Sequence, residues 1–186
     1  MSKKVLVIST SLRQNSNSDI LADEFIRGSC EAGCEVEKIS LAGKQIGFCR
    51  GCLACQKTQK CVIQDDAVGI AEKMRVADAV AFVTPIYYYE MSGQMKTLLD
   101  RMNPLFPADY HFREVYLIAT AADGDPAAMD GAANGLEGWI SCFPKTQLAG
   151  VVRGIGVNDS GEVKDHPELL HEAYAMGIST LTCFNN

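Results

Sequence analysis

The chain has 186 residues, of which 47% are hydrophobic and 22% charged, which fits one compact domain over residues 1–186. Its 17 Lys and Arg residues against 23 Asp and Glu residues give a formal net charge of −6. The longest basic run is the pair Lys3-Lys4. This charge distribution argues against nucleic acid or an anionic membrane surface as the partner.

The N-terminal segment MSKKVLVISTSL turns polar at once, so we expect no signal peptide. We also expect no membrane span, because no stretch approaches the roughly 20 apolar residues that one requires. Both features predict a cytoplasmic protein. Closely spaced cysteines in a reducing compartment are more often ligands or redox thiols than disulfides.

Short apolar, β-branched runs alternate along the chain with segments of helical periodicity. The strands are expected at residues 5–8, 36–41, 79–83, 115–119 and 148–152. Pro85 is expected to end the third strand, because proline cannot donate to a ladder. The helices are expected from Ser18 onward, from Asp65-Asp66 to Met74, over 93–102, around 136–140 and from Pro167 onward.

Five strands that alternate with five helices predict a parallel sheet covered on both faces, which is a doubly wound α/β fold. Such sheets bind ligands outside the carboxyl ends of their strands, where the strand order reverses. The loops after the first, third and fourth strands are therefore the expected site.

The first of these loops, residues 9–18, is crowded with hydroxyl and amide side chains and ends where a helix begins. The unpaired amides of a helix N-terminus attract anions, so this loop and Arg13 predict a phosphate site. The loop lacks the Walker and dinucleotide patterns, which indicates the phosphate of a smaller ligand. A plain polar loop with a serine cap is the alternative.

The other two loops offer an aromatic and a polar surface. Three consecutive tyrosines, Tyr87 to Tyr89, follow the third strand, and at least one should be exposed enough to line a planar aromatic ligand. Residues 120–125 supply small side chains and backbone amides for the polar edge of that ligand. Loops of both kinds also serve as subunit contacts or simple turns.

Ser9-Thr10-Ser11-Leu12-Arg13, followed by Ser16-Asn17-Ser18, resembles the G-S-x-R-x-x-S-N-T loop of flavodoxin-like NADPH-dependent FMN reductases. Ser9 replaces the usual glycine and Thr10 the usual serine. Pro85-Ile86-Tyr87 and the segment from Gln94 to Arg101 resemble the second signature of that family. The resemblance covers nearly the whole chain and implies a flavodoxin-like, five-stranded parallel sheet of order 2-1-3-4-5 that binds FMN.

The resemblance also implies which residues hold the cofactor. Those around the phosphate are Ser9, Ser11, Arg13, Ser16, Asn17 and Ser18. Those around the isoalloxazine are Pro85, Ile86, Tyr87, Tyr88, Thr120, Ala121, Ala122 and Asp123. Lys96, Asp100 and Arg101 belong to the second signature too, but on a surface helix they are as well explained as a structural set of salt bridges, which we favour. Because the flavin itself accepts the hydride, no dedicated catalytic acid or base is expected.

A third feature is the run Cys49, Cys52, Cys55 and Cys61. These cysteines are too closely spaced for the usual zinc pattern of two separated pairs, but they suit one compact iron–sulfur cluster. The run resembles the cysteine motif of iron–sulfur flavoproteins, a branch of the same group. A [4Fe–4S] cluster, a zinc site and metal-free thiols all remain open. The remaining cysteines are expected to be isolated, buried thiols: Cys30, Cys34, Cys142 and Cys183.

Two classes of function follow. One is an NAD(P)H-dependent FMN reductase that passes electrons to a flavin, quinone or similar small acceptor. The other is an iron–sulfur flavoprotein that transfers electrons through FMN and a [4Fe–4S] cluster. The resemblance and the tyrosine loop favour a homodimer or a dimer of dimers in either case.

Overall fold

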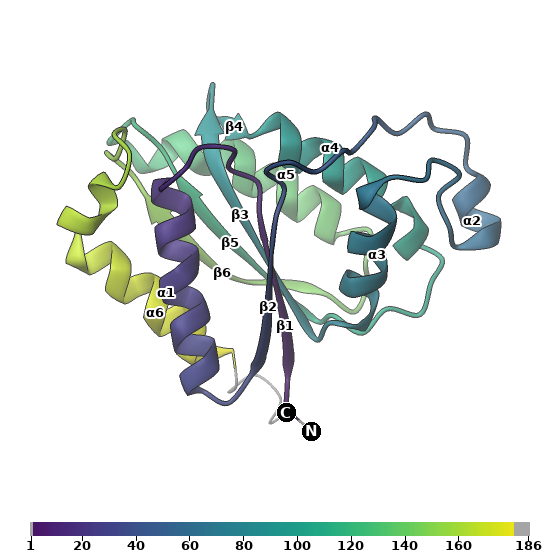
Figure 1. The fold of residues 1–186 in the computed structure, drawn as a ribbon, viewed down its shortest axis with the longest axis horizontal. Helices are drawn as coiled ribbons and strands as arrows, with labels where there is room; N and C mark the ends of the chain where they lie inside the picture. The colour runs from purple at the N-terminus through teal and green to yellow at the C-terminus, as the bar shows by residue number, and fades with distance from the viewer. Residues whose placement is uncertain (1, 181–186) are drawn as a thin grey trace.

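The computed structural model describes residues 2–180 and has a parallel sheet at its centre (Figure 1). Its long strands are β1 (Lys4–Ser9), β2 (Glu35–Ser40), β3 (Ala79–Tyr87), β5 (Glu114–Thr120) and β6 (Gln147–Gly154). They lie in the order β2-β1-β3-β5-β6, all parallel. The predicted order of the five long strands is therefore confirmed. A sixth, two-residue strand, β4 (Glu90–Met91), pairs antiparallel with the end of β3.

Helices cover both faces of this sheet (Figure 1). On one face lie α1 (Asn17–Glu31) and α6 (Pro167–Ser179); on the other lie α3 (Asp66–Val76), α4 (Gly93–Arg101) and α5 (Asp130–Ile140). The short helix α2 (Ala54–Thr58) projects away from the sheet in the long connection between β2 and α3. Three 3₁₀ turns span Asn103–Leu105, Pro126–Met129 and Glu162–Asp165.

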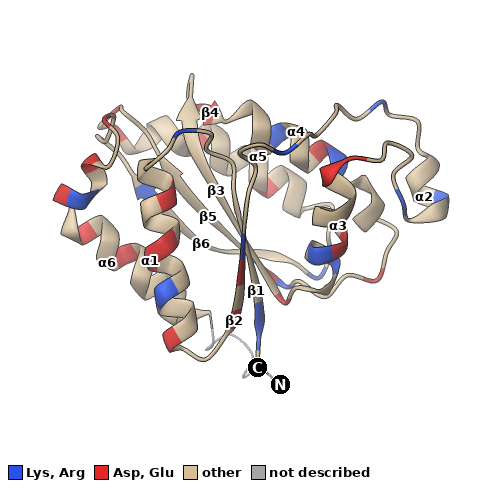
Figure 2. Cartoon of the chain, in the orientation of Figure 1, with Lys and Arg blue, Asp and Glu red and all other residues tan. Residues whose placement is uncertain are grey.

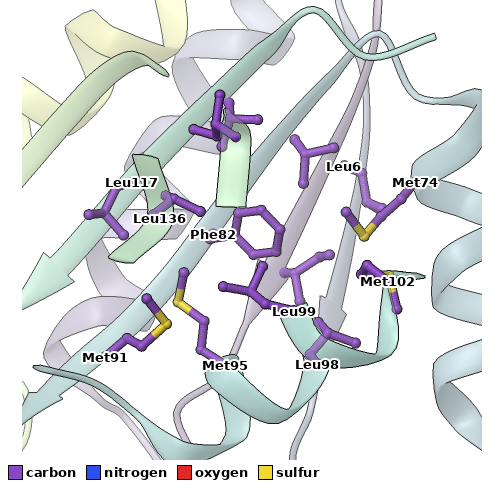
Figure 3. Packing of buried hydrophobic residues seen from close by; sticks show 14 of the residues in the cluster. Leu6, Met74, Phe82, Met91, Met95, Leu98, Leu99, Met102, Leu117 and Leu136 are labelled. Atoms are coloured by element: carbon purple, nitrogen blue, oxygen red, sulfur yellow. The ribbon is translucent and has the colours of Figure 1, made fainter. Parts of the chain in front are cut away.

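Each face of the sheet has its own hydrophobic core. Figure 3 shows Phe82 of β3 packed among Met95, Leu98 and Leu99 of α4. Successive side chains of a strand point to opposite faces, so Ala81 and Val83 enter the core under α1 and α6. This double burial explains why the central strands are apolar throughout.

Charged residues of both signs are interspersed along the helices (Figure 2). None of the helices within residues 2–180 combines the length and the apolar character that a bilayer crossing requires.

The structure corrects three details of the predicted elements. Strand β3 continues through Pro85 to Tyr87, because β1 ends opposite Val83 and leaves β3 with a free edge where proline is tolerated. Helix α1 is capped by Ser16, whose Oγ accepts from the amide of Asp19, two residues earlier than expected. The elements α2 and β4 were not predicted.

Two glycines allow α1 and α6 to cross closely. A Cβ at Gly177 would lie 2.1 Å from the carbonyl oxygen of Phe25, and one at Gly28 would lie 2.2 Å from that of Tyr174. We expect Gly177→Ala to lower the free energy of unfolding in urea by about 1–3 kcal/mol, because the backbones must move apart. Gly138→Ala in α5 is the control: its Cβ meets open space, so it should stabilise the protein by about 0.5–1 kcal/mol. Equal stability of Gly177→Ala and the parent would contradict this account.

Candidate functional site

The loop of residues 9–18, here called the phosphate loop, joins the carboxyl end of β1 to α1. Its two ends are buried although they are polar: Ser9, Thr10 and Ser11 at one end, and Ser16, Asn17 and Ser18 at the other. The first amides of α1 have no partner within the helix. The Oγ of Ser9 is buried without a hydrogen-bond partner among the described residues. The loop thus carries a buried, unpaired hydroxyl and leads into the free amides of a helix start, a combination that suits an anion.

Thr10, which was not among the predicted site residues, ties this loop to the next strand. Both its amide and its Oγ1 donate to the carbonyl oxygen of Val83, each at 2.9 Å. The Oγ1 also lies 2.9 Å from the Oγ of Ser92, which caps α4. These bonds lock the phosphate loop to β3 and α4 at the point where the strand order reverses.

The segment 158–163 supports the phosphate loop from outside. Asn17 donates from Nδ2 to the carbonyl oxygen of Asp159 (2.9 Å) and accepts from the Val163 amide (3.1 Å). Both polar atoms of the Asn17 side chain are therefore engaged within the protein. Arg13 is exposed, and its Nη1 donates to the carbonyl oxygen of Asn158 at 2.8 Å. These contacts join residues about 145 positions apart, so no local pattern in the sequence predicts them.

The tyrosine loop is a tight hairpin between β3 and β4. Tyr88 and Tyr89 both have positive φ, 51° and 65°, in a two-residue turn that normally takes Asn-Gly. A bulky residue in this region is strained, and such strain concentrates at functional sites. Tyr88 is completely exposed, Tyr87 is 55% exposed, and Pro85 and Ile86 are half-buried. The prediction of an exposed tyrosine is confirmed.

The hairpin and the loop after β5 are in contact. The hydroxyl of Tyr89 donates to Oδ2 of Asp123 at 3.3 Å. Thr120 and Ala121 are buried, and the Ala121 amide donates to the carbonyl oxygen of Gly154, so that amide does not face a ligand. The amides of Ala122 and Asp123, on exposed residues, have no partner among the described residues. The predicted residues after β1, β3 and β5 therefore gather at one edge of the sheet.

The segment of residues 41–65, here called the cysteine loop, leaves the carboxyl end of β2. All four of its cysteines line one small, partly open pocket. Leu53 and Gln59 flank α2 with left-handed backbone (φ 57° and 55°) and turn the chain around this pocket. Cys55 is buried, Cys61 is half-buried, and Cys49 and Cys52 are exposed.

The base of the cysteine loop is closed by an ion pair between Asp65 and Arg101. Arg101 Nη1 donates to Asp65 Oδ2 at 2.6 Å, and Nη2 donates to Oδ1 at 2.9 Å. The same guanidinium donates to the carbonyl oxygens of Gly47 and Ile63, one on each side of the cysteines. Asp65 also accepts from the amides of Gly47 and Ala67, the latter as the cap of α3.

This ion pair corrects the expectation for the second signature. Lys96 and Asp100 do form an exposed salt bridge at 2.6 Å, but the Arg101 side chain is fully buried. Burial alone would raise the pKa of the Asp65 carboxyl; its hydrogen bonds from Arg101, Gly47 and Ala67 outweigh that effect and hold the pKa below its usual range.

The other cysteines only partly follow their predicted burial. Cys34 is buried, but Cys30 and Cys142 are exposed. Cys183 lies outside the described residues.

The family model for NADPH-dependent FMN reductase matches residues 3–152. The chain belongs to this family. The match covers both signatures and the whole cysteine loop, and it ends before the supporting segment 158–163.

Among curated proteins, the FMN reductase-family chain is 41% identical over 102 residues to an iron-sulfur flavoprotein of Methanocaldococcus jannaschii, covering 55% of this chain and 53% of the relative. It is 33% identical over 98 residues to an iron-sulfur flavoprotein of Methanosarcina thermophila, covering 53% and 51%. The chain thus spans about half the length of the curated relatives it matches.

A solved structure, an NAD(P)H:quinone oxidoreductase from Methanothermobacter marburgensis, matches with a TM-score of 0.71 and 17% identity. The alignment covers 96% of this chain and 97% of that protein. At this identity the match supports the fold, which is flavodoxin-like as predicted.

The FMN reductase-family site meets two structural requirements of its expected groups. The buried phosphate loop, with its unpaired Ser9 hydroxyl, fits a phosphate, and the exposed tyrosines beside the loop after β5 fit a planar ring. The cysteine pocket fits a group that accepts several thiolates. Burial raises the pKa of the Cys55 thiol and a backbone hydrogen bond lowers it, while the neighbouring Cys61, Cys52 and Cys49 add to the rise.

Within the described residues, the cysteine pocket holds no preformed site for a single zinc ion. Sulfurs bound to one zinc at about 2.3 Å would lie within about 3.8 Å of one another. Within the described part of the chain, no three His, Cys, Asp or Glu side chains are gathered closely enough to hold one metal ion. The four cysteines line one pocket without such a gathering.

Proposed function

We propose that the protein is an NAD(P)H-dependent oxidoreductase that binds FMN at the carboxyl edge of its sheet and reduces a small acceptor. The observation that carries this proposal is the convergence of the phosphate loop, the tyrosine hairpin and the loop after β5 at the point of strand reversal. Family membership supports the identity of the cofactor. When bound, FMN supplies the hydride chemistry.

The residues of this chain would bind and orient the ring and its phosphate. The α1 amides and the serine hydroxyls of the phosphate loop would hold the phosphate, and Arg13 would screen its charge from the outer side. The amides of Ala122 and Asp123 would donate to the polar edge of the ring, and Tyr87 and Tyr88 would cover one of its faces. No dedicated acid or base is assigned, because the flavin accepts the hydride itself.

Hydride donor and acceptor are proposed to use the same open face in turn. With saturating FMN, the protein should oxidise NADH or NADPH, and double-reciprocal plots at several acceptor concentrations should be parallel. An intersecting pattern would contradict the proposal that donor and acceptor use the same face in turn. If the FMN-loaded protein oxidises neither NADH nor NADPH, the proposed reductase activity is contradicted, and an electron-transfer role is the remaining proposal.

A second function is favoured by a separate observation, the four cysteines around one pocket. We propose that Cys49, Cys52, Cys55 and Cys61 bind a [4Fe–4S] cluster, which carries single electrons. The similarity to iron-sulfur flavoproteins supports this assignment. In this form the protein would pass electrons between FMN and a one-electron partner.

The cluster assignment predicts the effect of Cys61→Ser. After anaerobic reconstitution with iron and sulfide, the parent should hold about four irons per chain. Cys61→Ser should lose that iron, because a neutral hydroxyl is a poor substitute for a thiolate ligand. Cys30→Ser is the matched control: Cys30 is an exposed cysteine of α1 outside the pocket, and its replacement should leave the iron content unchanged. Metal-free thiols are the correct description if the parent retains no iron.

We also propose that the protein works as a homodimer or a dimer of dimers in the cytoplasm. The exposed, strained Tyr88-Tyr89 turn supports a subunit contact near the flavin edge. Light scattering should give a mass of at least two chains. Tyr88→Asp should shift that mass toward one chain, and an unchanged monomer mass for the parent would contradict the proposal.

A further inference from the structure

Arg101 has one hydrogen-bond donor that the fold leaves unused. A guanidinium carries five N–H groups. Two on Nη1 are taken by Gly47 O and Asp65 Oδ2, and two on Nη2 by Ile63 O and Asp65 Oδ1. The fifth, on Nε, is buried and has no partner among the described residues. Buried donors are rarely left unpaired, so this one calls for an acceptor.

The surroundings of Arg101 indicate what that acceptor is. Arg101 lines the same pocket as the four cysteines. Its Nη2 is anchored on the carbonyl oxygen of Ile63, two residues after Cys61. Of the four cysteines in this pocket, Cys61 is therefore the one that adjoins the segment held by the guanidinium.

We propose that the Nε–H of Arg101 donates to the sulfur of Cys61 when that sulfur is an iron ligand, and that Arg101 thereby raises the reduction potential of the cluster. The inference rests on the proposed cluster and adds to it a residue that sets its potential. One-electron reduction adds one negative charge to the cluster and makes or breaks no bond. A buried positive charge and an N–H···S bond both stabilise the more negative, reduced state.

The geometry gives Arg101 a second role besides holding the cysteine loop in place. Its four other N–H groups already hold the two ends of the cysteine loop and its counter-ion, so Nε–H is the donor that remains for the cluster. Because those four bonds fix the guanidinium, the donor is held in place before the cluster binds. Lysine would keep the charge, but it lacks the planar fork and the Nε–H group.

The direct test uses the parent protein, so it does not depend on how a variant folds. Protein labelled with ¹⁵N-arginine is reconstituted with iron and sulfide and then reduced, and its electron spin echo modulation is recorded. We expect a ¹⁵N coupling to the cluster. Arg50 lines the same pocket but is exposed, so Arg50→Gln is the matched control and should keep the coupling. Parent protein with full iron content and no ¹⁵N coupling would overturn the inference.

The potential provides a second readout, which a purely structural role would not move. In an anaerobic redox titration followed by electron paramagnetic resonance, Arg101→Lys with full iron content should have a lower midpoint potential than the parent. The midpoint potential is expected to fall by about 59 mV. For a one-electron couple, this corresponds to a tenfold change in the ratio of oxidised to reduced cluster at a fixed applied potential. Arg50→Gln should shift the midpoint potential by less than half of that amount. Iron-loaded Arg101→Lys with the parent potential would overturn this inference alone, whereas a parent without iron would overturn the proposed cluster and this inference together.

Discussion

Replacing Asp65 by alanine is expected to lower the free energy of unfolding at pH 7 by about 3–5 kcal/mol. The Arg101 side chain is fully buried and that of Asp65 is 13% exposed, and removing one member of a buried pair leaves the other charge uncompensated. The same change also removes the cap of α3 and the acceptor for the Gly47 amide. Urea denaturation of the protein without cofactors measures the effect.

The neighbouring residue Asp66 provides the control. It accepts from the Gln45 amide at 2.7 Å and pairs with Lys44, but its side chain is 37% exposed. Asp66→Ala should therefore cost no more than about 1.5 kcal/mol. Equal losses for the two variants would mean that the buried pair contributes no more than a surface contact does.

The same ion pair gives stability a defined pH dependence. The pKa of Asp65 is lower in the folded protein, so its contribution is complete above the ordinary carboxyl pKa of about 3.9. It is lost as the pH falls through the lower, folded-state pKa. The stability difference between the parent and Asp65→Asn should thus be constant near neutrality and shrink in acid.

Ser16→Asp is expected to weaken FMN binding by at least about 100-fold, which corresponds to about 2.7 kcal/mol. Ser16 caps α1 within the proposed phosphate site, so an aspartate there would place a carboxylate against the phosphate. The stability of the apoprotein should not fall, because aspartate caps a helix as well as serine does and interacts favourably with the positive end of the helix. Quenching of flavin fluorescence during titration gives the affinity.

Ser16→Asn separates charge from shape. Asparagine caps as well as aspartate and has nearly the same size, but it is neutral. Its FMN affinity should stay within about tenfold of the parent. If the aspartate and asparagine variants bind FMN equally, or if the aspartate variant binds like the parent, the phosphate does not lie at the start of α1.

The central strands could be predicted because each is a short apolar run between segments of helical periodicity, whereas the order of the strands in the sheet followed from the resemblance to the FMN reductase family. Burial on both faces leaves this signal in the sequence, as at Phe82, Ala81 and Val83. The elements α2 and β4 left no such signal, since they span five and two residues. The turn between β3 and β4 was also hidden, because Tyr88-Tyr89 lacks the glycine or asparagine that marks such turns.

The site was predictable where it is local and not where it is assembled from distant segments. The polar loop of residues 9–18 could be singled out as a candidate because its polar residues are consecutive. The burial of Arg101 could not, because its partner Asp65 lies 36 positions away and its neighbours Lys96 and Asp100 look like a solvated helix surface. The contact between Asn17 and Asp159 could not be predicted either, because the two residues lie 142 positions apart.

The most direct test of the central claim, that FMN binds at the carboxyl edge of this sheet, is a titration of the apoprotein with FMN. Flavin fluorescence and protein-bound flavin are measured together after removal of free cofactor. The account predicts saturable binding with about one FMN per chain. An apoprotein that is folded by circular dichroism yet shows no saturable binding of FMN would contradict it.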